Sequence, residues 1–207
     1  MKTLLLSFFL VVISLCANAQ KSIRIYNRGV EFASQGNYEK ALINFTRAIA
    51  EDRLLTEAWF NRALAKSKVR DYNGAVEDYT IAISLQPGFS LAYNNRGADK
   101  NELNDHAGAI DDYSQAVRLN PGYARAYYNR GVAQFHLAKY ELALADFSKA
   151  IELDKNFADA WFNRALVKIQ LEDYKSALSD LDTLLAFMPG YVRAYQKRDE
   201  LKKIIDK

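Results

Sequence analysis

The chain has 207 residues, of which 50% are hydrophobic and 26% are charged, and its formal net charge is +3. This near balance of charge argues against a protein that binds nucleic acid without regard to sequence. The single cysteine, Cys16, lies in an N-terminal leader, so disulfides are excluded from the remainder, which is long enough to be held by core packing alone.

The N-terminal segment 1–19 has the features of a secretory signal peptide. Lys2 precedes an apolar run over residues 4–15, and a small residue, Ala19, ends the segment before the expected cleavage point. The run is shorter than the roughly 20 apolar residues of a membrane-spanning helix. We therefore expect export, to the periplasm or out of the cell, after cleavage. A retained anchor is one alternative; acylation at Cys16 is another, which the leucine before it disfavours.

After the leader, the chain repeats its own pattern at intervals of 34 residues. An arginine recurs in the same frame at Arg28, Arg62, Arg96, Arg130, Arg164 and Arg198. The first five arginines precede a glycine or alanine and follow an asparagine, at Asn27, Asn61, Asn95, Asn129 and Asn163. A fixed period of this length indicates a stacked array, in which each unit needs a neighbour to bury its apolar face.

Each period contains the pattern of two helices. In 56–89, two runs of apolar residues at helical spacing are separated by Arg70 and Asp71, and the aspartate can cap the second helix. The pairs Pro87-Gly88, Pro121-Gly122 and Pro189-Gly190 occupy one frame of the repeat. Because proline cannot continue a helix and glycine accepts a left-handed conformation, we expect these pairs to end the second helix.

The order of residues within each period resembles the tetratricopeptide repeat. An aromatic residue near the start of the first helix, Gly or Ala four residues later, two alanines flanking an aromatic residue in the second helix and a closing proline carry the resemblance. It implies an all-α fold, a right-handed α-solenoid of about five helix pairs over 22–190, whose first helices line a concave groove that binds peptides or proteins. The expected repeats are about 22–55, 56–89, 90–123, 124–157 and 158–191, followed by a capping helix at 192–207.

Charged residues recur with the same period. Aspartates stand sixteen residues after the arginine of their own repeat, at Asp78, Asp112, Asp146 and Asp180. We interpret them as partners of the arginines within or between repeats, with a ligand role for the arginines as the alternative. Lysines such as Lys66 and Lys168 stand where the family usually has an aromatic residue. We expect their stems to cover apolar surface while their charged heads reach water.

The asparagines and the residue before each of them are the candidate peptide-binding residues. A side-chain amide offers both a donor and an acceptor, so regularly spaced asparagines can hold the backbone of an extended peptide. Repeat three is unusually polar, with Asn94, Asp99, Asn101 and Glu102, which indicates either a specificity patch or drift on an exposed helix. The predicted site comprises Tyr26, Asn27, Phe60, Asn61, Asn94, Asn95, Asn101, Tyr128, Asn129, Phe162 and Asn163. The alternative is that the asparagines bond only within their own array.

No motif points to catalysis, a cofactor or a metal. The two histidines, His106 and His136, occupy different frames, and neither a phosphate-binding glycine loop nor a nucleophile elbow occurs. We therefore predict a non-enzymatic protein–protein interaction scaffold that binds a protein segment in its groove, without nucleic-acid or small-molecule ligands. The alternative is a structural assembly component of an envelope complex that docks through its convex face or ends. The leader resembles those of Bacteroidetes-type bacteria, which implies the periplasm. Partner and oligomeric state are left open.

Overall fold

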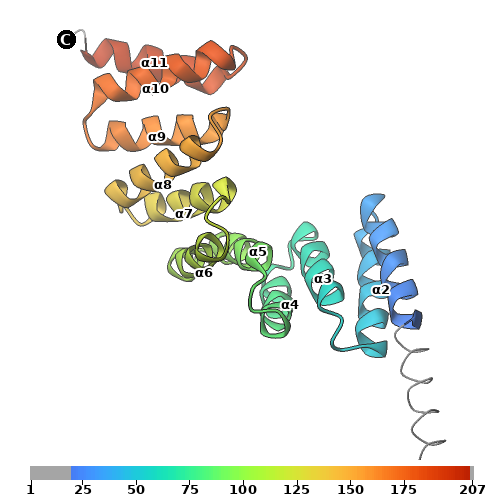
Figure 1. Ribbon diagram of the computed structural model, residues 1–207. Helices are drawn as coiled ribbons and strands as arrows, with labels where there is room; N and C mark the ends of the chain where they lie inside the picture. Colours follow the sequence, from blue (N-terminus) through green and yellow to red (C-terminus); the bar gives the residue numbers. More distant parts are fainter. Residues whose placement is uncertain (1–19, 206–207) are drawn as a thin grey trace, which may run out of the picture. The chain divides into compact units, whose positions relative to one another are not determined.

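The computed structural model describes residues 20–205, so the predicted signal peptide lies outside the described part. Residues 20–34 are helical, and ten further helices follow (Figure 1). They are α2 (Tyr38–Glu51), α3 (Thr56–Lys68), α4 (Tyr72–Leu85), α5 (Ser90–Glu102), α6 (His106–Leu119), α7 (Ala124–His136), α8 (Tyr140–Leu153), α9 (Ala158–Gln170), α10 (Tyr174–Phe187) and α11 (Val192–Ile205). Between residues 20 and 205 there is no strand, which confirms the all-α prediction. Within the same range, no helix combines the length and apolarity needed to cross a membrane.

The first helix of each pair ends in a left-handed turn. After α3, the N–H of Arg70 donates to the carbonyl of Ser67 at 3.0 Å and that of Asp71 to Lys66 at 2.9 Å. This is the Schellman pattern, and Arg70 has the left-handed φ of 66° that the pattern requires. The same conformation recurs in frame at Gly36, Asn104, Ala138 and Glu172. Only the first of these residues is the glycine that such a position favours.

The second helix ends differently from our expectation. Among the described glycines only Gly36 has a positive φ, so the prediction of left-handed glycines after the three prolines is wrong. The helix stops one residue earlier, at the residue before proline, where Gln86 has φ −134° and ψ 85°. Proline disfavours helical backbone in the residue before it, so the chain leaves the helix without a left-handed residue.

Four of the five second helices begin with a side-chain cap; the exception is α8, which follows Lys139. Asp71 accepts a hydrogen bond from the backbone N–H of Gly74 at 3.1 Å, as predicted. Asn37, Asp105 and Asp173 do the same for α2, α6 and α10. In these four pairs the turn therefore combines a left-handed residue with a capping side chain, two devices that satisfy the free backbone groups at helix ends.

Small residues allow the paired helices to approach closely. The alanine in the first turn of each second helix is fully buried, at Ala41, Ala75, Ala109, Ala143 and Ala177. The Gly or Ala after each arginine has a similar role, because a Cβ atom added at Gly131 would lie 2.9 Å from the ring of Phe147. The aromatic residue of the second helix thus fills the space left by the small residue of the first.

The chain divides into two compact units, Met1–Leu103 and Asn104–Lys207. The described part of the first unit contains helical residues 20–34 and α2 to α5, and that of the second contains α6 to α11. In the second unit, α9, α10 and α11 pack in succession (Figure 1). Leu181 and Leu184 of α10 are fully buried in one cluster with Ala194 and Leu201 of α11. Helix α11 thus covers the apolar face of the last pair.

Candidate functional site

The repeating arginines join helices of adjacent repeats. Arg62 donates through Nε and Nη2 to both carboxylate oxygens of Asp78, at 2.7 and 2.8 Å, and through Nη1 to Thr46 at 3.2 Å. Asp78 belongs to the second helix of the same repeat and Thr46 to that of the preceding repeat. We call this three-way contact the arginine link. It recurs at Arg130, with Asp146 and Ser114, and at Arg164, with Asp180 and Ser148.

The predicted pairing of arginine with aspartate therefore occurs within the repeat. The hydroxyl partner on the preceding repeat was missed, although Thr46, Thr80, Ser114 and Ser148 recur at the same period and could have revealed it. From Arg62 onward, each guanidinium of the series also lies over an aromatic ring three residues earlier, as Arg62 does over Trp59 at 4.8 Å. Guanidinium groups with so many internal contacts serve the fold.

Arg198 of α11 differs from the other arginines of the series in its partner on the preceding helix. The hydroxyl frame of the preceding helix instead holds Asp182, whose Oδ1 lies 3.8 Å from Nη1 of Arg198. A carboxylate on the preceding repeat thus takes over part of the charge compensation.

The lysines after the small residue also join this network. Nζ of Lys66 lies 3.0 Å from Oδ2 of Asp78 and donates to the carbonyl of Gly74 at 3.1 Å. Lys168 pairs likewise with Asp180 at 2.8 Å. The expectation that these two charged heads reach water is wrong, because the buried aspartate attracts them: their side chains are only 19% and 16% exposed.

Three of the predicted binding residues are buried. Phe60 lies 5.5 Å from Tyr79 and 4.7 Å from Phe89, ring centre to ring centre, and is 8% exposed. Phe162 packs against Tyr191 and is 3% exposed. Asn94, in the same frame, is 5% exposed. The expectation that these side chains face an open groove is wrong, because this frame points toward the second helix and the start of the next repeat.

The asparagines are held by the array but keep one polar group available. Nδ2 of Asn163 donates to the hydroxyl of Tyr128, thirty-five residues earlier, at 2.9 Å. Asn61 makes the same bond to Tyr26 at 2.8 Å. Burial raises the pKa of both tyrosine hydroxyls, which keeps them neutral. Within residues 20–205 the amide oxygen of Asn163 makes no hydrogen bond, so it remains free to accept one.

The other predicted asparagines lie on the first helices of the remaining repeats. Asn27 is exposed, whereas Asn95, Asn101 and Asn129 are half-buried. Asn95 accepts a hydrogen bond from Nδ2 of Asn94 at 3.2 Å. Bonding within the array is therefore established for Asn61, Asn95 and Asn163, while peptide binding by the asparagines stays a prediction.

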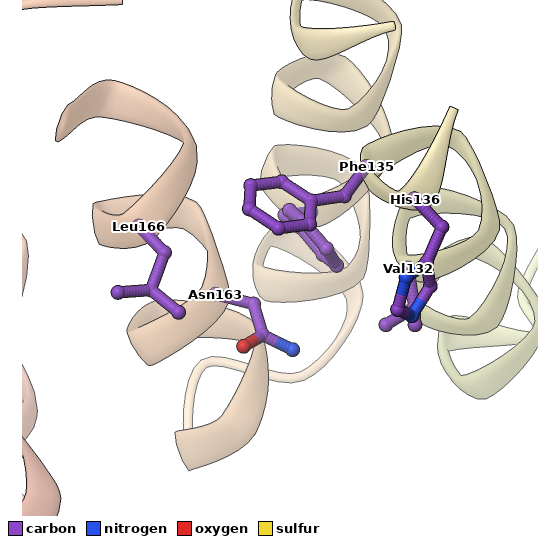
Figure 2. A pocket seen from close by; sticks show the side chains of 6 residues that line it. Val132, Phe135, His136, Asn163 and Leu166 are labelled. Atoms are coloured by element: carbon purple, nitrogen blue, oxygen red, sulfur yellow. The ribbon is translucent and has the colours of Figure 1, made fainter. Parts of the chain in front are cut away.

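A cavity of about 200 Å³ opens beside Asn163 in the second unit. Figure 2 shows Asn163 and Leu166 of α9 on one side and Val132, Phe135 and His136 of α7 on the other. Phe147 of α8 completes its lining. We call this cavity the apolar notch. It can accept one apolar side chain, with the amide of Asn163 placed to bond to the backbone that carries it.

The histidines meet at the edge of this notch. The ring of His136 stacks on that of His106 with centres 4.7 Å apart and planes 7° apart, although the two residues occupy different frames of the repeat. Among the described residues, no three His, Cys, Asp or Glu side chains gather in a way that could hold a metal ion. The pair thus forms a flat aromatic edge beside His136.

Sequence reasoning found Asn163 but missed the apolar lining. The available signal was Phe135, the only aromatic residue in the frame that also contains Ala33, Ser67, Asn101 and Ile169. A second cavity, of about 170 Å³, lies in the same frames two periods earlier, in the first unit. We call it the polar notch, and its lining residues are Leu64, Ser67, Lys68, Tyr79, Asn95, Ala98 and Asp99. Two repeats therefore present the same cavity with different chemistry.

Comparison with known proteins places these features in a family. Models described as tetratricopeptide repeat match residues 56–89, 124–157 and 158–186, and one described as TPR repeat matches 100–137. An uncharacterised protein of Methanocaldococcus jannaschii is 44% identical over 48 residues, which are 23% of this chain and 56% of that protein. The chain thus spans about half the length of this curated relative.

Solved structures agree with the family models. A tetratricopeptide repeat protein from Parabacteroides merdae superposes with a TM-score of 0.79 at 22% identity, covering 91% of this chain and 75% of that one. YrrB, described as a TPR protein with an unusual peptide-binding site, superposes with a TM-score of 0.76 at 20% identity, covering 91% and 97%. At these identities the likeness concerns the fold, and it confirms the predicted helical solenoid class. The chain belongs to the tetratricopeptide repeat family.

Proposed function

We propose that this protein is a non-enzymatic scaffold that binds an extended segment of a protein partner, with one apolar side chain of that segment in the apolar notch. The observation that carries the proposal is the free amide oxygen of Asn163 beside a cavity lined by Val132, Phe135 and Leu166. An apolar pocket with one fixed polar group is the usual composition of a site for a side chain and its backbone.

The size of the notch sets the class of side chain. A volume of about 200 Å³ suits one leucine, methionine or phenylalanine. Burial of such a side chain contributes about 1.5–3 kcal/mol, so it would act as the anchor of a longer contact. The hydrogen bond from Asn163 to Tyr128 fixes the amide before a ligand arrives, which lowers the entropic cost of binding.

The family and the leader support the rest of the proposal. The tetratricopeptide fold is compatible with protein–protein interaction, and its relative YrrB is described as having a peptide-binding site. We assign this protein the same class of ligand, with no catalysis, cofactor or metal. The apolar leader at 1–19 supports export to the periplasm or beyond.

Peptide selection tests the proposal. Random peptides displayed on phage are selected on the purified protein, and the affinities of the enriched peptides are measured by fluorescence anisotropy. Phe135→Ala and Leu166→Ala should each weaken binding about tenfold or more, because each removes apolar contact with the anchor. Leu142→Ala is the matched control, since Leu142 lies on α8 and is 55% exposed.

The result also separates binding at the apolar notch from binding elsewhere on the protein. Loss of binding in the notch variants with unchanged binding in Leu142→Ala supports the notch. Equal affinity in all variants, or loss only in Leu142→Ala, would overturn the proposal in favour of docking elsewhere. Circular dichroism of each variant checks that the helices are intact.

A further inference from the structure

We propose that the polar notch binds a basic side chain, lysine or arginine, of a protein partner. The inference deepens the proposed function, because it names the chemistry that a second site reads in the bound segment. The notch is lined by residues of α3 and α5 in the first unit and by Tyr79 of α4, and it has a volume of about 170 Å³. A cavity of this size holds the stem and head of one long side chain.

Asp99 is the main reason for this assignment. In the same frame, Ala65, Ala133 and Val167 are buried and apolar and Glu31 of the first repeat is exposed, whereas Asp99 is a carboxylate that is buried, at 5% exposure. Its Oδ2 accepts a hydrogen bond from the Ser67 hydroxyl at 2.6 Å. Burying a carboxylate without a cation destabilises the folded protein. Because alanine or valine fills the same position in other repeats, packing does not require a carboxylate there.

Comparison with Asp78 shows what Asp99 lacks. Asp78 is equally buried, at 2% exposure, but Arg62 and Lys66 both pair with it. Within residues 20–205, by contrast, no lysine or arginine nitrogen lies within 4.0 Å of the Asp99 carboxylate. Lys68 lines the notch without reaching this distance. The first unit therefore contains one compensated and one uncompensated buried aspartate.

A second buried polar group lines the same notch. The hydroxyl of Tyr79 is fully buried, and the side chains of Ser67 and Asn95 approach it without the geometry of a full hydrogen bond. Phenylalanine occupies this frame at Phe45 and Phe147, so packing does not require the hydroxyl. Unsatisfied buried polar atoms are rare in folded proteins. The oxygens of Tyr79 and Asp99 together offer acceptors, which match the donors of an ammonium or guanidinium group.

The surroundings favour a cation with an aliphatic stem. Burial raises the pKa of Asp99 to about 6; the hydrogen bond from Ser67 opposes this, and the nearby charge of Glu102 adds to it. Near neutral pH the carboxylate is therefore ionised and attracts a positive charge. Leu64 and Ala98 supply apolar walls along which a lysine or arginine stem can lie.

The two notches would then read different side chains. The frame of Ser67 holds Phe135 in the lining of the apolar notch, and the frame of Asp99 holds Val167, which is buried beside Phe147. Because the two notches occupy the same positions of the repeat, we attribute the difference in ligand preference to these differences in side chain. Specificity of this kind arises from buried polar groups that a wrong ligand leaves unpaired.

Fixed-position peptide pools test the inference. Capped peptide mixtures carry lysine, arginine, norleucine or glutamate at one position, and their retention by the immobilised protein is measured. Norleucine matches the stem of lysine without its charge. The lysine and arginine pools should be retained about tenfold better than the norleucine pool, because charge-assisted hydrogen bonds are stronger than neutral ones. Asp99→Asn should abolish the preference, whereas Glu102→Gln, an equal charge change at an exposed residue of α5, should keep it.

A second experiment does not depend on peptide binding. The Asp99 carboxyl carbon is followed by NMR through a pH titration, with and without n-butylammonium chloride, against sodium chloride of equal ionic strength. The cation should lower the pKa of Asp99, and Tyr79→Phe should reduce this effect.

The combined outcomes separate the two proposals. A lowered pKa with no retained pool supports the cation site and rejects the peptide scaffold. Retained pools without a basic preference, and an unchanged pKa of Asp99, overturn the inference while the scaffold stands. If neither experiment shows an effect, both proposals are wrong.

Discussion

Replacing Asp99 with asparagine should stabilise the protein at neutral pH and have little effect in acid. The change keeps the shape of the side chain and an oxygen that can accept from Ser67, so the main difference is the charge. The pKa of Asp99 is raised from 3.8 to about 6, which means that the fold favours the protonated form. A shift of this size corresponds to about 3 kcal/mol at most.

The sign follows from proton linkage. Between about pH 4 and pH 6 the folded protein holds a proton at Asp99 that the unfolded chain has lost, so stability falls as the pH rises through this window. Below the window Asp99 is protonated in both the folded and the unfolded protein, so it does not lower the free energy of unfolding. Above the window it is ionised in both, and the full destabilisation from burying the charge is present. Asp99→Asn removes this cost, so its advantage in unfolding free energy over the natural protein should grow across the window from near zero to at most about 3 kcal/mol.

Urea unfolding at a series of pH values checks this prediction, followed by circular dichroism and by the fluorescence of Trp59 in the first unit. Taking the difference in unfolding free energy between Asp99→Asn and the natural protein at each pH cancels the contributions of the other titrating groups. Glu102→Gln is the control, and its difference should be small at every pH because Glu102 is exposed. A stability difference for Asp99→Asn that does not change with pH would refute the description of Asp99 as a buried, uncompensated carboxylate.

The remaining predictions concern the fold and the apolar notch. Asp146→Asn should destabilise by on the order of 3 kcal/mol in urea unfolding, because it leaves Arg130 without its carboxylate partner; unchanged stability would show that the arginine link contributes little. Ala143→Leu should cost about 1–3 kcal/mol by overpacking a fully buried crossing, and an unaltered melting temperature would contradict that placement. Asp71→Ala should cost about 1 kcal/mol through loss of the cap of α4, with Asp71→Asn as the tolerated control in thermal unfolding. Asn163→Ala should weaken a selected peptide by about 0.5–1.5 kcal/mol in calorimetry with little change in melting, and equal affinity would limit the asparagine to bonding with Tyr128.

The period of the sequence was sufficient to predict the helix pairs, because each repeat carries its own turn, cap and small residues. The shared period likewise predicted that the arginines pair with the aspartates, and the structure shows that Arg62 pairs with Asp78 of its own repeat. Both features depend on contacts within one repeat or between neighbours in a regular frame. Such contacts follow from the periodicity of a helix and the reversal of direction at a known turn.

The rest depends on how three helices meet. The burial of Phe60 results from Phe89, which arrives from the start of the next repeat, and helical spacing alone does not place that residue. The apolar notch forms where Phe135 and Leu166, from different repeats, leave a gap above Phe147. Asp99 is uncompensated because no lysine or arginine nitrogen of the described residues lies within 4.0 Å of its carboxylate. The order of residues along the sequence does not give such distances.

The arginine link has a consequence for how such a chain can gain repeats. A copy of residues 124–157 inserted after position 157 would bring its own arginine and aspartate, and it would find the serine of the preceding copy in place. Next to α11, by contrast, the position of the serine is held by Asp182, which compensates Arg198 in part. Duplication of an internal repeat is therefore compatible with this interface without any change of residue.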